Sequence, residues 1–386
     1  MEEWHTMQIS RHHSLPSKGG IPMKIQALPQ SIINPALKVR DDIKSDFVLK
    51  ALILANDGAG PLTITKLTYG LVALNRLVKE IVYPGDALTE RIEDGYQQIT
   101  KNDPLILKSM LGSSIRWRSE EMSKTRVLQP GQEALLLNEY FIAVASAPID
   151  ALELRIQYRQ NGIEANERLV LPVTDYHTRN AYTFPLRGVW QVSGNYDYYW
   201  GHRTHYALEF SIDMEKLTND GMLRWKNDMV NEDFLSYGQQ VFAIGDGEVM
   251  DCFNDAHWRI LFHDDFGDEK KIMKLRQIQE RVGCMPLQYG NYVVLKHAHG
   301  EYSVYAHMIE GSITVQKGNH VRQGDVLGRV GNVGFSTGPH LHFHLMDGPD
   351  VYSARGLPCH FTNLMDCRRN PLSLIQQEYT LVMAKS

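Results

Sequence analysis

Three histidines alternate with apolar residues near the end of the chain, in residues 331–345, GNVGFSTGPHLHFHL. They are His340, His342 and His344. Alternate side chains of a β-strand point to the same face, so a strand would place the three imidazoles together. At about 3.3 Å of rise per residue, neighbours on that face lie roughly 6.5–7 Å apart. Two of them could share one metal ion, or one could bind the ion while the other acts on a substrate. The structural alternative is a row of core or solvent-facing histidines.

A second group of possible ligands lies in residues 201–213, GHRTHYALEFSID. His205 and Glu209 are separated by three residues, and in a hairpin or loop both can face one side. A catalytic zinc ion usually has three protein ligands and one open position. With an imidazole from the first group, His205 and Glu209 would supply two histidines and one carboxylate. The alternative is that His205 is an ordinary strand histidine and Glu209 a surface carboxylate.

These segments resemble those of the M23 (lysostaphin/LytM-type) zinc metallopeptidases. The resemblance rests on HYALE, YAHM and GFSTGPHLHFHL, and on the glycine-containing segments YGQQVFAIGDGEV, GNYVVL and VRQGDVLGRVGNVG. It covers roughly residues 190–362 and implies a β-rich LytM-type domain with a duplicated hybrid motif. It also implies a Zn²⁺ cofactor and hydrolysis of a peptide bond, with peptidoglycan cross-links as the substrate class.

The resemblance also implies a role for each site residue. His205, Glu209 and His342 would bind the zinc ion, and His340 would be the general base for the metal-bound water. His307 of YAHM would stabilise the oxyanion. His344 would lie behind the ligands or along the groove.

This chain departs from the family pattern in two places. Glu209 stands where the family has Asp, and the extra methylene moves the carboxylate by about 1.5 Å when metal–oxygen distances must be near 2.0–2.2 Å. Asp213 and His202 are therefore alternative ligands. Residues 255–288 form a long insert, and its segment DEKKIMKLRQIQERVG has apolar residues at helical spacing, which predicts an inserted helix or lid.

The rest of the chain predicts a mainly β protein of two domains. Residues 24–175 contain short alternating segments separated by turn signals, which favours an Ig-like β-sandwich accessory domain. Residues 176–386 form the predicted peptidase domain, and residues 1–23 a mobile leader. Because every proposed site residue follows residue 200, the chemistry is expected to need nothing from the first half.

Composition excludes several classes of protein. The 386 residues carry a formal net charge of −5, which does not favour nucleic acid or an anionic membrane as the partner. Four cysteines without a C-x-x-C pair predict free thiols, with neither a disulfide scaffold nor a thiolate zinc site. The sequence shows neither a transmembrane segment nor a signal peptide, so it indicates a cytoplasmic protein, or an exported one if it acts on the cell wall. The sequence predicts no oligomeric state.

Three other functions fit parts of the pattern. The chain could be a catalytically silent M23-like binding or regulatory protein, or a cytosolic peptidase that acts on soluble peptides. A cupin-type metal oxygenase also uses H-x-H on a β-barrel. However, Met346 and Asp347 stand where its glutamate is expected, and no later P-x-G…H segment follows.

Overall fold

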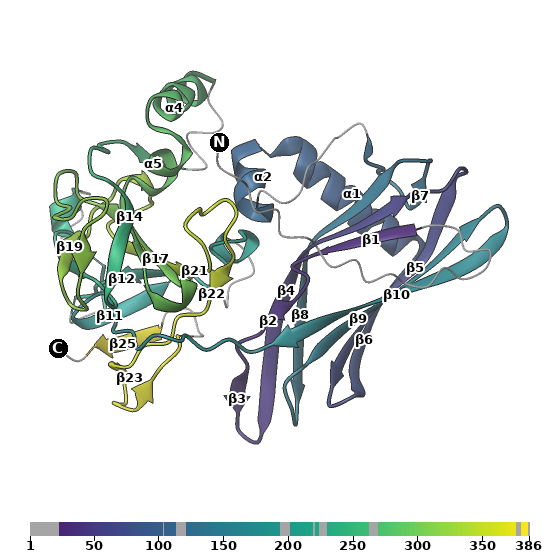
Figure 1. The fold of residues 1–386 in the computed structure, drawn as a ribbon, viewed down its shortest axis with the longest axis horizontal. Helices are drawn as coiled ribbons and strands as arrows, with labels where there is room; N and C mark the ends of the chain where they lie inside the picture. The colour runs from purple at the N-terminus through teal and green to yellow at the C-terminus, as the bar shows by residue number, and fades with distance from the viewer. Residues whose placement is uncertain are drawn as a thin grey trace.

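The computed structural model describes residues 23–102, 104–112, 121–193, 201–218, 221–223, 230–261, 269–375 and 380–384. Apart from Met23, the predicted mobile leader lies outside the described residues. Strands dominate the described part of the chain, as predicted, and Figure 1 shows two β-rich bodies side by side. Within the described residues, no helix is both long enough and apolar enough to cross a membrane.

The N-terminal body contains two β-sheets. The first consists of β1 (Met23–Leu28), β3 (Leu37–Val39), β4 (Asp42–Asn56) and β8 (Glu133–Ala145). The second consists of β2 (Ile32–Ile33), β5 (Leu62–Ala73), β6 (Arg76–Pro84), β7 (Val127–Leu128), β9 (Ala151–Gln160) and β10 (Ile163–Thr174). In the first sheet β4 pairs with β8 along one edge and with β1 and β3 along the other, and the second sheet has the order β2-β10-β9-β5-β6 with β7 beside β5.

The two sheets share one core. Phe47 and Leu49 of β4 pack in a single buried cluster with Leu67 and Tyr69 of β5 and with Leu154 of β9. Strand β9 alternates buried with less buried residues and so buries one face, whereas β4 is buried along both faces. Two sheets around one core agree with the predicted sandwich, while its Ig-like connectivity stays a prediction.

Two helices cover the first sheet. Helix α1 (Gly85–Lys101) buries Leu88, Ile92, Gly95 and Ile99, a spacing that places them on one helix face. Gly95 lets this helix approach β8 closely, because a Cβ there would lie 2.2 Å from the carbonyl oxygen of Leu135. Helix α2 (Pro104–Leu111) lies on the side of this body that faces the C-terminal body (Figure 1).

The C-terminal body is built around one large sheet. Its strands are β11 (Gly188–Ser193), β12 (Ile212–Glu215), β14 (Gly247–Phe253), β16 (Asn291–Lys296), β17 (Tyr302–Met308), β18 (His320–Val321), β21 (Leu341–Met346), β22 (Gly356–Leu357), β23 (Leu364–Asp366), β24 (Pro371–Leu372) and β25 (Thr380–Ala384). The order is β18-β14-β16-β17-β21-β12-β11-β25-β23-β24, with β22 beside β21. Two further pairs join β13 (Gln240–Phe242) to β19 (Val326–Arg329) and β15 (Arg259–Ile260) to β20 (Gly334–Phe335). Strand β21 therefore lies between β17 and β12.

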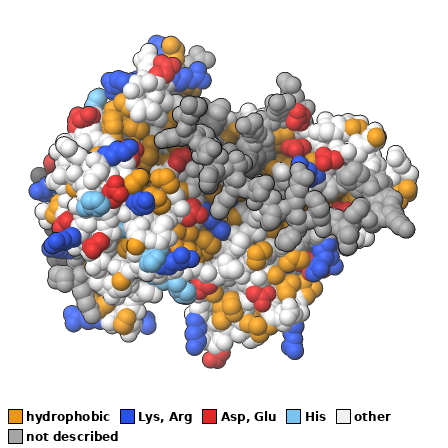
Figure 2. Space-filling view, viewed as in Figure 1, with side chains coloured by type: hydrophobic (Ala, Val, Ile, Leu, Met, Phe, Trp, Pro, Cys, Tyr) orange, Lys and Arg blue, Asp and Glu red, His pale blue; other side chains and the backbone are white. Residues whose placement is uncertain are grey.

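The predicted helical insert is present. Helices α4 (Glu269–Val282) and α5 (Cys284–Tyr289) interrupt the strand order between β15 and β16. Within the described ranges, the short 3₁₀ helices η2 (Gly201–Thr204), η3 (Asn231–Asp233) and η4 (Ala298–Gly300) lie in connections between strands. On the face shown in Figure 2, cationic and anionic side chains of the described residues are interspersed.

A single buried carboxylate holds residues 176–182, which connect the two bodies, through hydrogen bonds. Glu301 is 1% exposed and accepts hydrogen bonds from the hydroxyls of Tyr176 at 2.6 Å and Tyr182 at 2.7 Å. It also accepts from the backbone N–H of Arg179 at 2.9 Å and from Asn180 Nδ2 at 2.6 Å. Burial alone would raise the pKa of Glu301, but these hydrogen bonds outweigh it and lower the pKa.

Candidate metal centre

Three neighbouring strands bring the site together. Asp213 of β12 stands directly opposite His342 of β21, and Ala306 of β17 stands opposite His342 on its other side. Residues opposite each other in an antiparallel pair point to the same face of the sheet. The pairing register therefore places the Asp213 carboxylate against the His342 ring, although the two residues are 129 positions apart in the chain.

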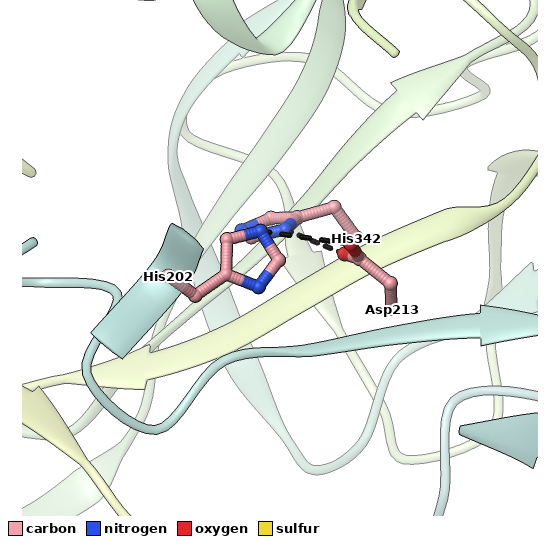
Figure 3. Close-up of side chains that lie close together, drawn as sticks. All are labelled: His202, Asp213 and His342. Carbon is pink, nitrogen blue, oxygen red and sulfur yellow. Dashed lines mark hydrogen bonds and ion pairs between the residues drawn. The ribbon is translucent and has the colours of Figure 1, made fainter. Parts of the chain in front are cut away.

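His202, Asp213 and His342 form a group whose potential ligand atoms all lie within 4.8 Å of one another. Oδ1 of Asp213 is 2.9 Å from Nδ1 of His342, and Oδ2 is 3.5 Å from Nε2 of His202. Figure 3 shows the His202 ring projecting from η2 toward the two strand residues. Two imidazoles and one carboxylate are a donor set that suits zinc, with a position left for water or substrate.

His344 supports the His342 ring from behind. Nδ1 of His342 faces the Asp213 carboxylate, so a metal ion shared with Asp213 would bind at Nδ1. In that state Nε2 of His342 carries the proton and donates it to Nδ1 of His344, 3.0 Å away. His344 is fully buried, and its Nε2 has no hydrogen-bond partner among the described residues. Partners of this kind fix the orientation and tautomer of a metal-binding imidazole.

His307 and His340 lie beside this group. Their ring centroids are 4.8 Å apart, and the His307 ring is 5.7 Å from that of His342. In each ring Nδ1 is hydrogen-bonded to a carbonyl oxygen at 2.8 Å, that of Val333 for His307 and that of Gly338 for His340. Because a carbonyl only accepts, Nδ1 carries the proton in both rings and Nε2 is the basic nitrogen when the ring is neutral.

An unusual backbone conformation turns His307 toward the site. Ala306 is paired with His342, so a regular strand would point His307 to the opposite face. His307 instead has φ 66°, a left-handed value that residues other than glycine seldom adopt and that occurs preferentially at functional sites. Gly331 makes room for this turn, because a Cβ there would lie 2.6 Å from the His307 carbonyl oxygen and 2.5 Å from the Ile309 nitrogen.

Burial sets the charge of the group. It lowers the pKa of His342 to about 4, against the opposing effect of Asp213, and it lowers the pKa of His307 well below its ordinary value. Burial would raise the pKa of Asp213, but His202, His340 and His342 together lower it. Near neutral pH the imidazoles of His342 and His307 are thus neutral and Asp213 is ionised. These are the states in which such side chains bind a metal ion.

The other two residues predicted as ligands have different partners in the structure. Nδ1 of His205 forms a 2.8 Å hydrogen bond with Ser109 Oγ, and Oε2 of Glu209 lies 3.6 Å from Lys50 Nζ. Neither belongs to the group of potential ligands found among the described residues. That group contains the predicted ligand His342 together with His202 and Asp213, which the sequence offered as alternative ligands. Residues 201–213 begin with the 3₁₀ helix η2 and reach β12 only at Ile212, so the spacing of His205 and Glu209 does not place both at the sheet face.

Part of the chain that carries the site matches a known protein family. The profile of peptidase family M23 matches residues 233–353, which include His307, His340 and His342. This part of the chain belongs to peptidase family M23. His202 and Asp213 precede the matched residues, and the pairing of β12 with β21 places Asp213 beside His342, which lies within them.

Short segments of the chain are similar to curated peptidases. Over 55 residues it is 49% identical to the DD-carboxypeptidase/endopeptidase Mpg of Neisseria meningitidis, a match that covers 14% of this chain and 12% of that protein. Over 57 residues it is 44% identical to the peptidoglycan DD-endopeptidase ShyA of Vibrio cholerae, covering 15% and 13%. The matched segment thus spans only about an eighth of the length of these relatives.

One solved structure aligns with most of the chain. It is a zinc-containing peptidase from Vibrio cholerae, 12% identical, with 84% of this chain and 83% of that chain covered and a TM-score of 0.27. A TM-score of this size does not establish a shared overall fold.

Proposed function

We propose that the protein is a zinc-dependent metalloendopeptidase that hydrolyses peptide bonds in peptidoglycan cross-links. The observation that carries the proposal is the group of His202, Asp213 and His342 with two further histidines, His307 and His340, beside it in an M23 domain. The substrate class is supported by the relatives, which are named as a DD-carboxypeptidase/endopeptidase and a peptidoglycan DD-endopeptidase. A protein with this activity would meet its substrate outside the cytoplasm.

The metal ligands in this proposal are His202, Asp213 and His342. Their donor atoms are close enough to share one ion, and His344 and the strand pairing orient the His342 ring. When bound, zinc would polarise the scissile carbonyl and lower the pKa of a water molecule. Elemental analysis at saturating zinc tests the assignment. His202→Ala, Asp213→Ala and His342→Ala should each lose the metal, whereas His205→Ala and Glu209→Ala should keep one equivalent.

The two remaining histidines would move protons. Nε2 of His340 is free of the carbonyl contact and lies 3.6 Å from Asp213 Oδ1, at the edge of the ligand group, which suits a base that takes a proton from the attacking water. The same proton can then be given to the leaving amine. His307 can stabilise an oxyanion only with a proton on Nε2, and its lowered pKa keeps that form rare until a proton is released nearby.

Purified peptidoglycan provides the decisive substrate. The full chain with zinc should release new amino groups, and mass spectrometry of the fragments should identify a cut peptide bond, while His340→Ala should release none. Cleavage of soluble peptides with every tested wall type left intact would overturn the wall assignment. Stoichiometric zinc without any turnover would instead indicate a binding or regulatory protein.

A further inference from the structure

The N-terminal body contacts the segment that supplies two of the three proposed ligands. Residues 202–213, here called the ligand segment, begin with His202 and end with Asp213. Strand β4 and helix α2 reach this segment from the N-terminal body, and their contacts fall on residues between the two ligands. The N-terminal body therefore holds the segment at positions that lie between the two proposed metal-binding side chains.

Lys50 makes the most unusual of these contacts. It lies in the apolar strand β4, its side chain is 0% exposed, and its ammonium donates a hydrogen bond to the backbone carbonyl of Arg203. The same ammonium is 3.6 Å from Oε2 of Glu209, a side chain that is 2% exposed, and this oxygen has no hydrogen-bond partner in the part of the chain that the structure describes. Lys50 thus joins the residue next to His202 to a residue four positions before Asp213.

Two neighbouring contacts act on the same segment. Asp46, four residues before Lys50 in β4, forms an ion pair with Arg203 at 2.7 Å. Ser109 of α2 binds His205 Nδ1 at 2.8 Å through its hydroxyl and accepts a 2.9 Å hydrogen bond from the Tyr206 backbone N–H through its carbonyl. The ligand segment is consequently held from the N-terminal body at Arg203, His205, Tyr206 and Glu209.

Stability alone does not account for the buried pair of Lys50 and Glu209. Removing two charges from water is costly, and well-packed apolar residues in place of a buried ion pair are often equally or more stable. Such a pair does fix geometry, because either partner left alone is an uncompensated buried charge. A pair that spans two bodies and ends on the ligand segment therefore fits a role in placing that segment.

We infer that Lys50 is a positioning residue of the metal centre, which makes the N-terminal body a working part of that centre. Through the Arg203 carbonyl and Glu209, Lys50 holds the ligand segment in the position in which His202 and Asp213 lie beside His342. This inference rests on the proposed metal site. It explains why Glu209, although not placed among the ligands, is buried beside the segment that carries them.

The test measures the zinc dissociation constant of the full chain by competition with a chelating dye, with the melting temperature recorded in parallel. Lys50→Met should weaken zinc binding about 10–100-fold, the usual effect of removing an outer partner of metal ligands, and should still bind one equivalent at saturation. Glu209→Gln, which keeps the side-chain volume, should weaken it in the same direction. If Lys50→Met does not fold, Glu209→Gln carries the test.

Arg91→Met is the matched control. Arg91 binds the buried carboxylate of Glu139, at 3.1 Å through Nε, within the N-terminal body and with no contact to the ligand segment among those described. This variant should lower the melting temperature and leave the zinc dissociation constant unchanged. Unchanged zinc binding in Lys50→Met, or equal weakening in Lys50→Met and Arg91→Met, would overturn the inference. If wild-type zinc binding does not depend on His342, the proposed site itself fails, which is a distinct result.

Discussion

Asp213 and His342 face each other across adjacent antiparallel strands, with the carboxylate 2.9 Å from the ring nitrogen. The backbone pairing of β12 with β21 therefore fixes the distance between two of the proposed ligands. A shift of one residue in that register would turn one of the two side chains to the opposite face of the sheet.

Asp213→Asn should test the carboxylate with little change in shape. The amide is neutral and a poorer ligand for zinc, so we expect loss of most bound zinc and of turnover, measured by elemental analysis and amino-group release. Asp251→Asn is the control, because Asp251 is a carboxylate of the same sheet that accepts a 2.7 Å hydrogen bond from Tyr292. Equal zinc content in the two variants would contradict the assignment of Asp213.

His340→Ala and His307→Ala should separate chemistry from metal binding. Both variants should keep one zinc, and turnover should fall about 10²–10⁴-fold, the usual contribution of a positioned acid or base. The exposed His320 lies outside the site, so His320→Ala should behave like the wild type. Turnover close to that of the wild type in both site variants would mean that the protein does not use this mechanism.

Gly331→Ala should disturb the backbone that presents His307. The added Cβ would lie within 2.6 Å of the His307 carbonyl oxygen and cannot be accommodated without movement. We expect a loss of about 1–3 kcal/mol in the free energy of unfolding and reduced turnover, measured by denaturant titration and by amino-group release. Gly338→Ala is the control for stability alone, since its nearest neighbour would be 3.9 Å away while its carbonyl accepts from His340. A similar loss of stability in both variants would argue against a specific role for Gly331.

Acid should destabilise the metal-free protein. Burial, the largest cause in each case, lowers the pKa of His205 to about 3 and that of His342 to about 4, from 6.5. Between pH 6.5 and 4 the unfolded chain binds protons that the folded chain does not, so stability falls as the pH falls. Each such histidine contributes at most about 1.4 kcal/mol per pH unit in this window. Melting temperatures in chelator from pH 8 to 4.5 should therefore decrease, with a shallower slope in His205→Gln, and a flat profile would refute the prediction.

The alternating histidines were predictable because strand periodicity is local. His340, His342 and His344 precede or lie in β21 as the pattern predicts, and His342 belongs to the group of potential ligands. The left-handed conformation of His307 has no local signal, because a close approach by Gly331 permits it.

The partner of His342 was harder to predict. Its position depends on which residue of β12 stands opposite it, a register set by contacts between distant parts of the chain. Sequence spacing favoured His205 and Glu209, whose side chains contact Ser109 and Lys50. A lysine within the apolar run FVLKALILA of β4 was a visible signal that a buried charge needs a partner, but the sequence does not name that partner.

The four hydrogen bonds to Glu301 decide where the C-terminal body can be joined to another protein. Tyr176, Arg179, Asn180 and Tyr182 precede β11, the first strand of the large C-terminal sheet, yet they donate hydrogen bonds to a buried carboxylate of that body. A hybrid protein grafted at residue 183 would leave that carboxylate buried without its donors, at a cost of several hydrogen bonds to a charged group. A hybrid protein that keeps the C-terminal body should therefore include the chain from Tyr176 onward, so that residues 176–182 stay together with the buried Glu301.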